Sequence, residues 1–167
     1  MSGDRVIWIT GLSGAGKTTL ARVLLPLLPQ PRLFLDGDEM REALALLAGG
    51  YGRDDRLKLA LTYARLCQLA AGQGHNVVCS TISLFHEVHQ WNRVNLPGYF
   101  EVFISLPEAV INERDYKRIY NRADCGPIMG RTIPPQFPLN PDLQITDPDM
   151  EPQEAAMMIL SHCALFR

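Results

Sequence analysis

Residues 6–21 read VIWITGLSGAGKTTLA, and this stretch decides the fold. An apolar run typical of a buried parallel strand leads into a glycine-rich loop, and a helical pattern follows. Residues 11–18 fit the pattern G-x-x-x-x-G-K-[ST] of a phosphate-binding loop, which requires this order of strand, loop and helix. Glycines let the backbone curl so that successive N–H groups face a phosphate, and the helix start adds partial positive charge. The stretch therefore predicts a nucleoside triphosphate site.

Individual residues of this loop have expected roles at that site. Lys17 reaches the β- and γ-phosphates, and the hydroxyl of Thr18 is a ligand for Mg²⁺. A nucleoside triphosphate with Mg²⁺ is therefore the predicted ligand. The alternative, a glycine-rich turn with an exposed lysine, is disfavoured because a strand and a helix flank the loop. The residues expected to bind the nucleotide are Gly11, Ser13, Gly14, Ala15, Gly16, Lys17, Thr18 and Thr19.

Outside this stretch, strand and helix patterns alternate along the chain. We expect strands at 5–10, 32–35, 76–80, 99–104 and 143–146, and helices at 17–28, 38–48, 54–71, 84–95, from Pro107, and at 154–165. Such alternation predicts an α/β fold, a P-loop NTPase-type three-layer sandwich with a five-stranded, mainly parallel sheet and helices on both faces. The length suits a single domain over residues 1–167. Residues 116–142, here called the lid segment, begin basic and become proline-rich, which predicts a lid or substrate loop.

Composition limits the classes of protein to consider. Apolar residues make up 47% of the chain and charged residues 20%, which excludes a disordered tail. The 16 Lys and Arg against 18 Asp and Glu give a net charge of −2, which argues against a general binder of nucleic acid polymers. No apolar run approaches the ~20 residues of a membrane span, and the N-terminus does not resemble a signal peptide. The four cysteines lack paired spacing, so we expect reduced thiols in a soluble, cytoplasmic protein.

Two acidic residues after the second expected strand distinguish between classes of nucleotide enzyme. Asp36 and Asp38 lie at the carboxyl end of that strand, where open α/β sheets bind ligands. The chain lacks the Asn-Lys-x-Asp stretch of a GTPase, and its third strand ends without the acid typical of a motor ATPase. A carboxylate here favours a kinase in which it accepts the proton of an acceptor hydroxyl. Arg41, one helical turn beyond Asp38, would face the same ligand, and either acid could also cap the helix.

Several short motifs complete an ordered set over residues 5–146. They are GLSGAGKTTLA (11–21), LDGDEMR (35–41), Asp55-Arg56, STIS (80–83), ERDYK (113–117), Tyr120 and NPDL (140–143). In this order they resemble the adenylylsulfate (APS) kinase family of P-loop kinases. The resemblance implies transfer of the γ-phosphoryl group of ATP to the 3′-hydroxyl of adenosine 5′-phosphosulfate, giving PAPS and ADP in sulfate assimilation. It also implies Mg²⁺ as cofactor, a small-molecule nucleotide as acceptor, and a homodimer.

The same resemblance implies roles for individual residues. Lys17 would act in catalysis together with Asp36 and Asp38, and which of the two acids is the base stays open. Arg114, at the start of the basic part of the lid, would contact the phosphates of ATP and stabilise charge during transfer. The residues that would bind the acceptor are Asp36, Asp38, Arg41, Tyr51, Arg56, Ile82, Ser83 and Lys117.

The departures from the family pattern gather on the acceptor side. Leu59 replaces an asparagine that contacts the acceptor, Leu84 replaces a proline, and His86 replaces an arginine. Ile128 aligns with an aromatic residue that stacks on the acceptor adenine, and a lost stacking ring costs about 1–3 kcal/mol. These departures predict weakened adenine recognition. They leave open another nucleotide-linked acceptor, such as cytidine diphosphoramidate, or an ATP-binding regulatory protein without transfer activity.

Overall fold

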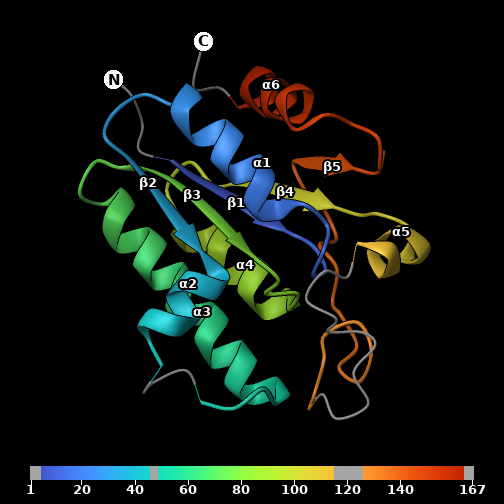
Figure 1. Cartoon of the computed structure of the whole chain (residues 1–167). Helices are drawn as coiled ribbons and strands as arrows, with labels where there is room; N and C mark the ends of the chain where they lie inside the picture. Colours follow the sequence, from blue (N-terminus) through green and yellow to red (C-terminus); the bar gives the residue numbers. More distant parts are fainter. Residues whose placement is uncertain (1–4, 46–48, 115–125, 164–167) are drawn as a thin grey trace.

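The computed structural model describes residues 5–45, 49–114 and 126–163. Its sheet has five strands in the order β2-β3-β1-β4-β5, and each neighbouring pair is parallel (Figure 1). The strands are β1 (Val6–Thr10), β2 (Arg32–Asp36), β3 (Asn76–Thr81), β4 (Phe100–Ile104) and β5 (Leu143–Ile145). The predicted α/β sandwich is confirmed, and β5 forms one edge of the sheet. A parallel order of this kind brings the carboxyl ends of all strands to one side, where a ligand site can form.

Helices cover both faces of the sheet (Figure 1). The helices are α1 (Lys17–Leu24), α2 (Gly37–Ala43), α3 (Arg53–Ala71), α4 (His86–Asn95), α5 (Glu108–Glu113) and α6 (Pro152–His162), with the 3₁₀ turn η1 (Leu25–Leu27) after α1. Helices α1 and α6 pack together on one face, and α3 and α4 pack on the other. None of the helices in the described ranges has the length and apolarity that a membrane crossing requires.

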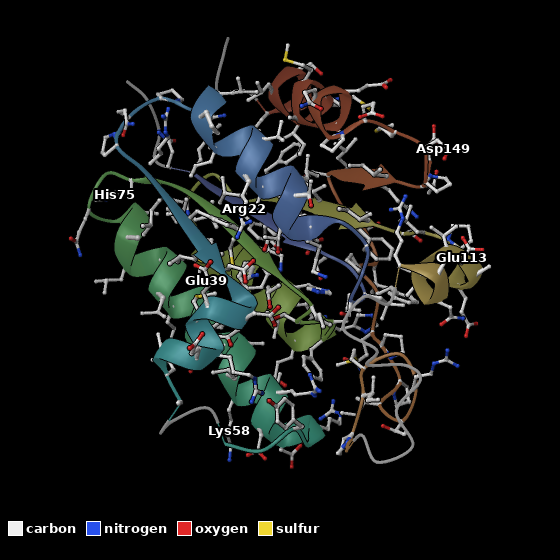
Figure 2. All side chains as sticks on the ribbon, viewed as in Figure 1. Arg22, Glu39, Lys58, His75, Glu113 and Asp149 are labelled. Atoms are coloured by element: carbon white, nitrogen blue, oxygen red, sulfur yellow. The ribbon has the colours of Figure 1, made fainter. Side chains whose placement is uncertain are left out.

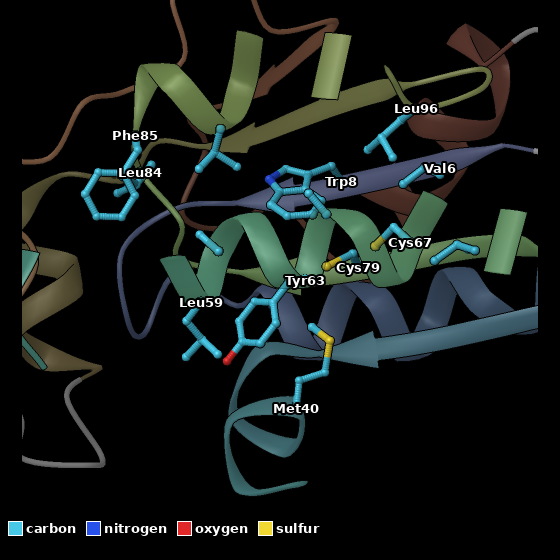
Figure 3. Close-up of a cluster of buried hydrophobic side chains, with 14 of the residues drawn as sticks. Val6, Trp8, Met40, Leu59, Tyr63, Cys67, Cys79, Leu84, Phe85 and Leu96 are labelled. Carbon is cyan, nitrogen blue, oxygen red and sulfur yellow. The ribbon is translucent and has the colours of Figure 1, made fainter. Parts of the chain in front are cut away.

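One apolar core lies on each side of the sheet, because alternate residues of each strand point to opposite faces. In β1, Val6 and Trp8 enter the core against α3 and α4, whereas Ile7 and Ile9 enter the core against α1 and α6. Figure 3 shows the first core around the fully buried Trp8. Cysteines 67, 79 and 163 are buried and form no disulfide among the described residues, and Cys125 lies outside those residues. Charged side chains such as Lys58, Glu113 and Asp149 lie on the surface (Figure 2).

The ends of several helices differ from those expected, for identifiable local reasons. The helix expected at 17–28 ends at Leu24, because Pro26 occupies the following 3₁₀ turn. Helix α2 begins one residue early, at Gly37, because the carboxylate of Asp36 caps it, and it ends at Ala43 instead of residue 48. Helix α6 begins at Pro152, two residues before the expected start, because proline suits the first helical turn.

The described part of the lid segment, residues 126–142, is docked on the domain. Met129 and Ile133 are buried in the core against α3 and α4, and the backbone N–H groups of residues 131, 132 and 133 all donate to the carbonyl of Ile128. The N–H of Gln136 donates to the carbonyl of Leu84 at 3.0 Å, which joins this segment to the start of α4. The expected loop is therefore a packed strap over residues 126–137, and its first ten residues, 116–125, lie outside the described ones.

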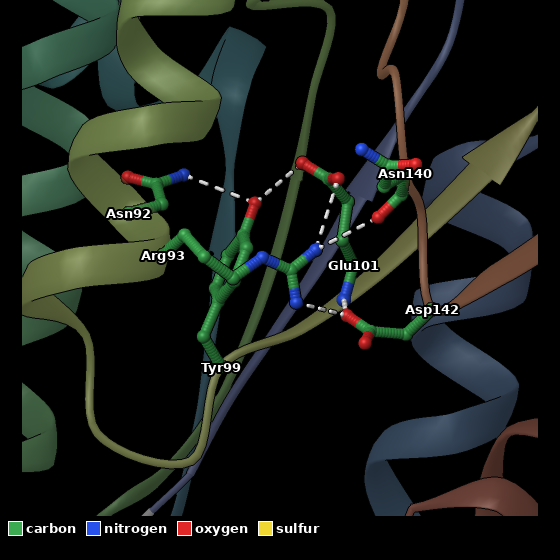
Figure 4. Close-up of polar contacts among 6 residues, drawn as sticks. All are labelled: Asn92, Arg93, Tyr99, Glu101, Asn140 and Asp142. Atoms are coloured by element: carbon green, nitrogen blue, oxygen red, sulfur yellow. Dashed lines mark hydrogen bonds and ion pairs between the residues drawn. The ribbon is translucent and has the colours of Figure 1, made fainter.

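A polar network anchors the far end of the lid segment to α4 and β4 (Figure 4). Arg93 donates to Asp142 at 2.7 Å and to the buried Glu101 at 3.3 Å. The hydroxyl of Tyr99 donates to Glu101 at 2.7 Å, and the backbone N–H of Glu101 donates to Asp142 at 2.7 Å. Burial raises the pKa of Glu101 above its ordinary value despite these partners. The network fixes the chain immediately before β5, and so holds the lid segment at its end.

Candidate active site

A cleft of about 1400 Å³ opens at the carboxyl ends of the strands. It is lined by residues from the β1–α1 loop, the ends of β2 and β3, α3, the lid segment and the chain before α6. Apart from Gly11 and Lys117, the predicted site residues all line it: Ser13, Gly14, Ala15, Gly16, Lys17, Thr18, Thr19, Asp36, Asp38, Arg41, Tyr51, Arg56, Ile82, Ser83 and Arg114. Lys117 lies outside the described residues. The structure thus brings the predicted donor and acceptor residues together in one cleft.

Gly11 is not among the residues that line the cleft, and its place in the fold depends on the absence of a side chain. Its φ is +153°, and a Cβ placed there would lie 2.6 Å from the carbonyl oxygen of Ile104. The absence of a side chain therefore lets the phosphate loop leave β1 directly against the end of β4. The predicted role of Gly11 in binding the nucleotide stays a prediction beside this packing role.

The rest of the phosphate loop has the geometry that an anion site requires. Gly14 and Gly16 adopt positive φ values of 83° and 96°, and α1 begins directly after them at Lys17. The Nζ atom of Lys17 donates to the carbonyl of Leu12 in the same loop at 2.7 Å. This contact holds the ammonium group over the concave side of the loop, where the helix start and the curled backbone favour negative charge.

Asp36 is a buried carboxylate whose oxygen atoms are both used inside the protein. Oδ1 accepts from the backbone N–H of Asp38 at 3.0 Å and caps α2, and Oδ2 accepts from the hydroxyls of Thr18 at 2.7 Å and Ser80 at 2.9 Å. Burial raises the pKa of Asp36, but these hydrogen bonds outweigh it and hold the pKa below its ordinary value. Since the hydroxyl of Thr18 donates its proton to Asp36, its lone pairs can face a cation. The residues present therefore fit a Mg²⁺ site beside the phosphate loop.

Asp38 differs from Asp36 in its exposure. Its side chain is exposed and lines the cleft, one residue into α2. The capping alternative considered for both acids is therefore correct for Asp36, which is the N-cap of α2. Both acids line the cleft, but their environments differ, because Asp36 is buried and Asp38 is exposed.

Two arginines flank an exposed tyrosine on the acceptor side. The guanidinium of Arg41 lies 4.3 Å from the ring centroid of Tyr51, and that of Arg56 lies 5.3 Å from it. Both guanidiniums donate to backbone carbonyls: Arg41 to Gly50, and Arg56 to Tyr51 at 2.7 Å and to Pro127 of the lid segment at 2.9 Å. Neither forms an ion pair with a carboxylate of the described residues. Burial and the charge of Arg41 lower the pKa of Arg56, which indicates that an anion would be favoured between them.

The wall beside these arginines is apolar. Leu59 is 6% exposed and packs in the same core as Tyr63, Phe85 and Met129. Ile128, at the position expected for a stacking aromatic, also lines the cleft. The hydroxyl of Tyr63 donates to the carbonyl of Gly37 at 3.0 Å, so its polar end is paired within the protein. This wall offers shape and apolar contact to a base, with few hydrogen-bonding groups.

The end of β3 contributes hydroxyls that the sequence analysis did not assign. Ser80 and Thr81 are buried and line the cleft, and only Ile82 and Ser83 after them were predicted. Ser83 has a φ of +33°, unusual for a residue with a side chain, and its hydroxyl lies 2.8 Å from that of Thr81. Successive side chains of a strand point to opposite faces, and this alternation was the sequence signal that could have identified Ser80 and Thr81 as site residues.

The donor side has a second wall that was also missed. Arg114 ends α5, and its Nη2 atom donates to the carbonyl of Pro148 at 2.6 Å. Residues 147–152 line the cleft there, and the N–H of Asp149 donates to Asp147 at 2.9 Å to form a tight turn. The sequence analysis assigned no site role to the acids of this turn. Asp147, Asp149 and Glu151 line the cleft, and the contact between Arg114 and Pro148 joins their turn to the end of α5.

Comparison with known proteins agrees with this geometry. The family model for adenylylsulphate kinase matches residues 3–146. An adenylyl-sulfate kinase of Deinococcus deserti is 39% identical over 165 residues, covering 95% of this chain and 90% of the relative. A cytidine diphosphoramidate kinase of Campylobacter jejuni is 39% identical over 121 residues, covering 71% of this chain and 70% of the relative. The structure of the Mycobacterium tuberculosis APS kinase CysC in complex with AMPPNP and APS has a TM-score of 0.81 at 31% identity, covering 97% of this chain and 98% of that one.

Proposed function

Since this chain belongs to the adenylylsulphate kinase family, we propose that it transfers the γ-phosphoryl group of ATP to a hydroxyl group of a nucleotide acceptor. One observation carries the proposal: the phosphate loop, the exposed carboxylate of Asp38 and the arginines 41 and 56 line the same cleft. A phosphoryl donor held by the loop would therefore meet an anionic acceptor beside a base.

The donor half of the reaction depends on the phosphate loop. Its backbone N–H groups and the ammonium of Lys17 bind the β- and γ-phosphates, and Arg114 covers the nucleotide from the other wall. The hydroxyl of Thr18 is the ligand that this chain offers to Mg²⁺, which when bound neutralises charge on the transferring phosphates. Asp36 positions that hydroxyl through the 2.7 Å hydrogen bond.

The acceptor half depends on Asp38 and the two arginines. Asp38 accepts the proton of the acceptor hydroxyl as that oxygen attacks the γ-phosphorus, because its side chain is exposed and lines the cleft whereas Asp36 is buried and caps α2. Arg41 and Arg56 bind the acidic group of the acceptor, since neither guanidinium forms an ion pair with a carboxylate of the described chain. We infer a cytoplasmic location from the expected reduced thiols, and a homodimer as the active form from the family resemblance.

Two acceptors are candidates. The first is adenosine 5′-phosphosulfate, phosphorylated at its 3′-hydroxyl, because relatives that cover nearly the whole chain carry the name adenylyl-sulfate kinase. The second is cytidine diphosphoramidate, for which the Campylobacter jejuni relative is named. It is a candidate because the apolar wall weakens the recognition of adenine. Leu59 and Ile128 line the cleft at the positions where the family pattern has a hydrogen-bonding amide and a ring that stacks on adenine. Together these losses weaken adenine binding by about 2–4 kcal/mol.

An acceptor-dependent ATPase assay tests the proposal. Release of ADP would be followed in a coupled assay with Mg²⁺, comparing adenosine 5′-phosphosulfate with cytidine diphosphoramidate at micromolar concentrations. We expect ADP release that depends on one of these acceptors and is lost in Asp38→Asn. Nucleotide binding without turnover on either acceptor would contradict the proposal and favour an ATP-binding regulatory protein.

A further inference from the structure

The carboxyl end of β3 places two consecutive hydroxyls on opposite faces of the sheet. Ser80 points to the donor side, where its hydroxyl donates to Asp36 at 2.9 Å and lies 3.5 Å from that of Thr18. Thr81 points the other way, toward the acceptor side, where it lies against Gly37 and its hydroxyl meets Ser83. The strand geometry therefore assigns one hydroxyl to each half of the cleft.

The hydroxyl pair of Thr81 and Ser83 has one proton more than the protein uses. Their oxygens lie 2.8 Å apart, and a single proton makes that hydrogen bond. Among the described residues, neither hydroxyl has another partner. Both residues are 6% exposed and line the cleft, so the second proton faces a nearly dehydrated site. A buried hydroxyl proton without an acceptor costs free energy, which a ligand oxygen would remove.

The surroundings of Thr81 limit the kinds of chemical group to which that ligand oxygen can belong. A Cβ on Gly37 would lie 3.0 Å from the Thr81 hydroxyl, so only a glycine leaves the hydroxyl open at this point. The nearby carbonyl of Gly37 already accepts from Tyr63. The same part of the cleft carries Arg41, whose charge acts on Tyr63 and which lacks a carboxylate partner among the described residues. An oxygen of an anionic group suits both the hydroxyl donor and this cation.

We propose that Thr81, paired with Ser83, is a specificity-determining residue that donates a hydrogen bond to an oxygen atom of the acidic group of the acceptor. The inference rests on the proposed kinase function. Selectivity of this kind is large, because a site built to hydrogen-bond a group is left with an unpaired polar atom when that group is missing.

The test compares Thr81→Val, which removes the hydroxyl at constant shape, with Thr81→Ser, which keeps it. Thr62→Val is the matched control, since Thr62 lies outside the cleft lining and its hydroxyl donates to the carbonyl of Lys58. With whichever of the two acceptors the wild type turns over, we expect Thr81→Val to raise the acceptor KM about tenfold and leave the ATP KM unchanged. Thr81→Ser and Thr62→Val should stay within about twofold of the wild type.

Adenosine and cytidine, which lack an acidic group, serve as competitive inhibitors to locate the contact. We expect each to inhibit Thr81→Val and the wild type equally. The inference would be overturned by an unchanged acceptor KM in Thr81→Val. It would also be overturned if inhibition by the nucleosides weakened in this variant as much as acceptor binding does. In both cases, turnover by the wild type would still support the proposed function. Failure of the wild type to turn over either acceptor would overturn both.

Discussion

The two aspartates of the β2–α2 junction should respond differently to the same substitution. In Asp36→Asn, the amide oxygen can still cap α2, but the charged acceptor for the hydroxyls of Thr18 and Ser80 is lost. The hydroxyls can rotate to accept from the new amide, so each hydrogen bond loses only its charge-assisted part, about 1–1.5 kcal/mol. The expected loss of unfolding free energy is therefore about 2–3 kcal/mol, or about 4–12 °C in Tm for a domain of this size.

Asp38→Asn should leave stability almost unchanged and remove the base. The side chain is exposed, and surface substitutions usually change the unfolding free energy by less than about 0.5 kcal/mol. Loss of a general base lowers kcat by about 10²–10⁴-fold. Calorimetry would give Tm, and the coupled assay would give kcat. The Mg²⁺ concentration required for activity would be measured for both variants, and we expect this concentration to rise in Asp36→Asn. The reasoning is refuted if Asp38→Asn keeps its kcat while Asp36→Asn loses kcat at an unchanged Tm.

Three further predictions concern the arginine fork, a buried histidine and the polar network. Arg56→Lys cannot span both carbonyl contacts, so the acceptor KM should rise about tenfold at constant ATP KM; a similar rise in Arg53→Lys would contradict this. Burial lowers the pKa of His89 to about 4, with smaller contributions from its neighbours. The unfolded state therefore binds the proton more tightly, and the free energy of unfolding falls by about 3 kcal/mol as the pH is lowered from 6.5 to 4. Urea titrations should show that the free energy of unfolding depends less on pH in His89→Gln. Arg93→Met leaves the buried carboxylate of Glu101 without its cation, so Tm should fall by about 4–12 °C and largely recover in Arg93→Met/Glu101→Gln.

The fold followed from local sequence signals because local and tertiary requirements agree. The apolar run before Gly11 has the composition of a strand buried on both faces, and it forms the central strand of the sheet. Helix ends were less predictable, because they depend on single contacts. Asp36 starts α2 a residue early by accepting from the backbone, and the sequence could not say which of two nearby acids would do so.

The site was predicted where chemistry requires particular residue types and missed where it depends on tertiary placement. Lys17 and Thr18 follow from the phosphate loop alone, and the structure places both in the cleft. The roles of Thr81 and of residues 147–152 depend on which face of a strand points to the cleft and on a contact with Arg114. The lid segment was expected as a loop, but its buried Met129 holds residues 126–137 against the domain.

Phosphorus NMR of the reaction products tests the central claim most directly. Wild-type protein would be incubated with Mg-ATP in two separate reactions, one with adenosine 5′-phosphosulfate and one with cytidine diphosphoramidate. The account predicts that one acceptor gains a phosphomonoester resonance in step with ADP, and that Asp38→Asn forms neither. ATP cleaved to ADP and inorganic phosphate at the same rate with and without either acceptor would contradict it.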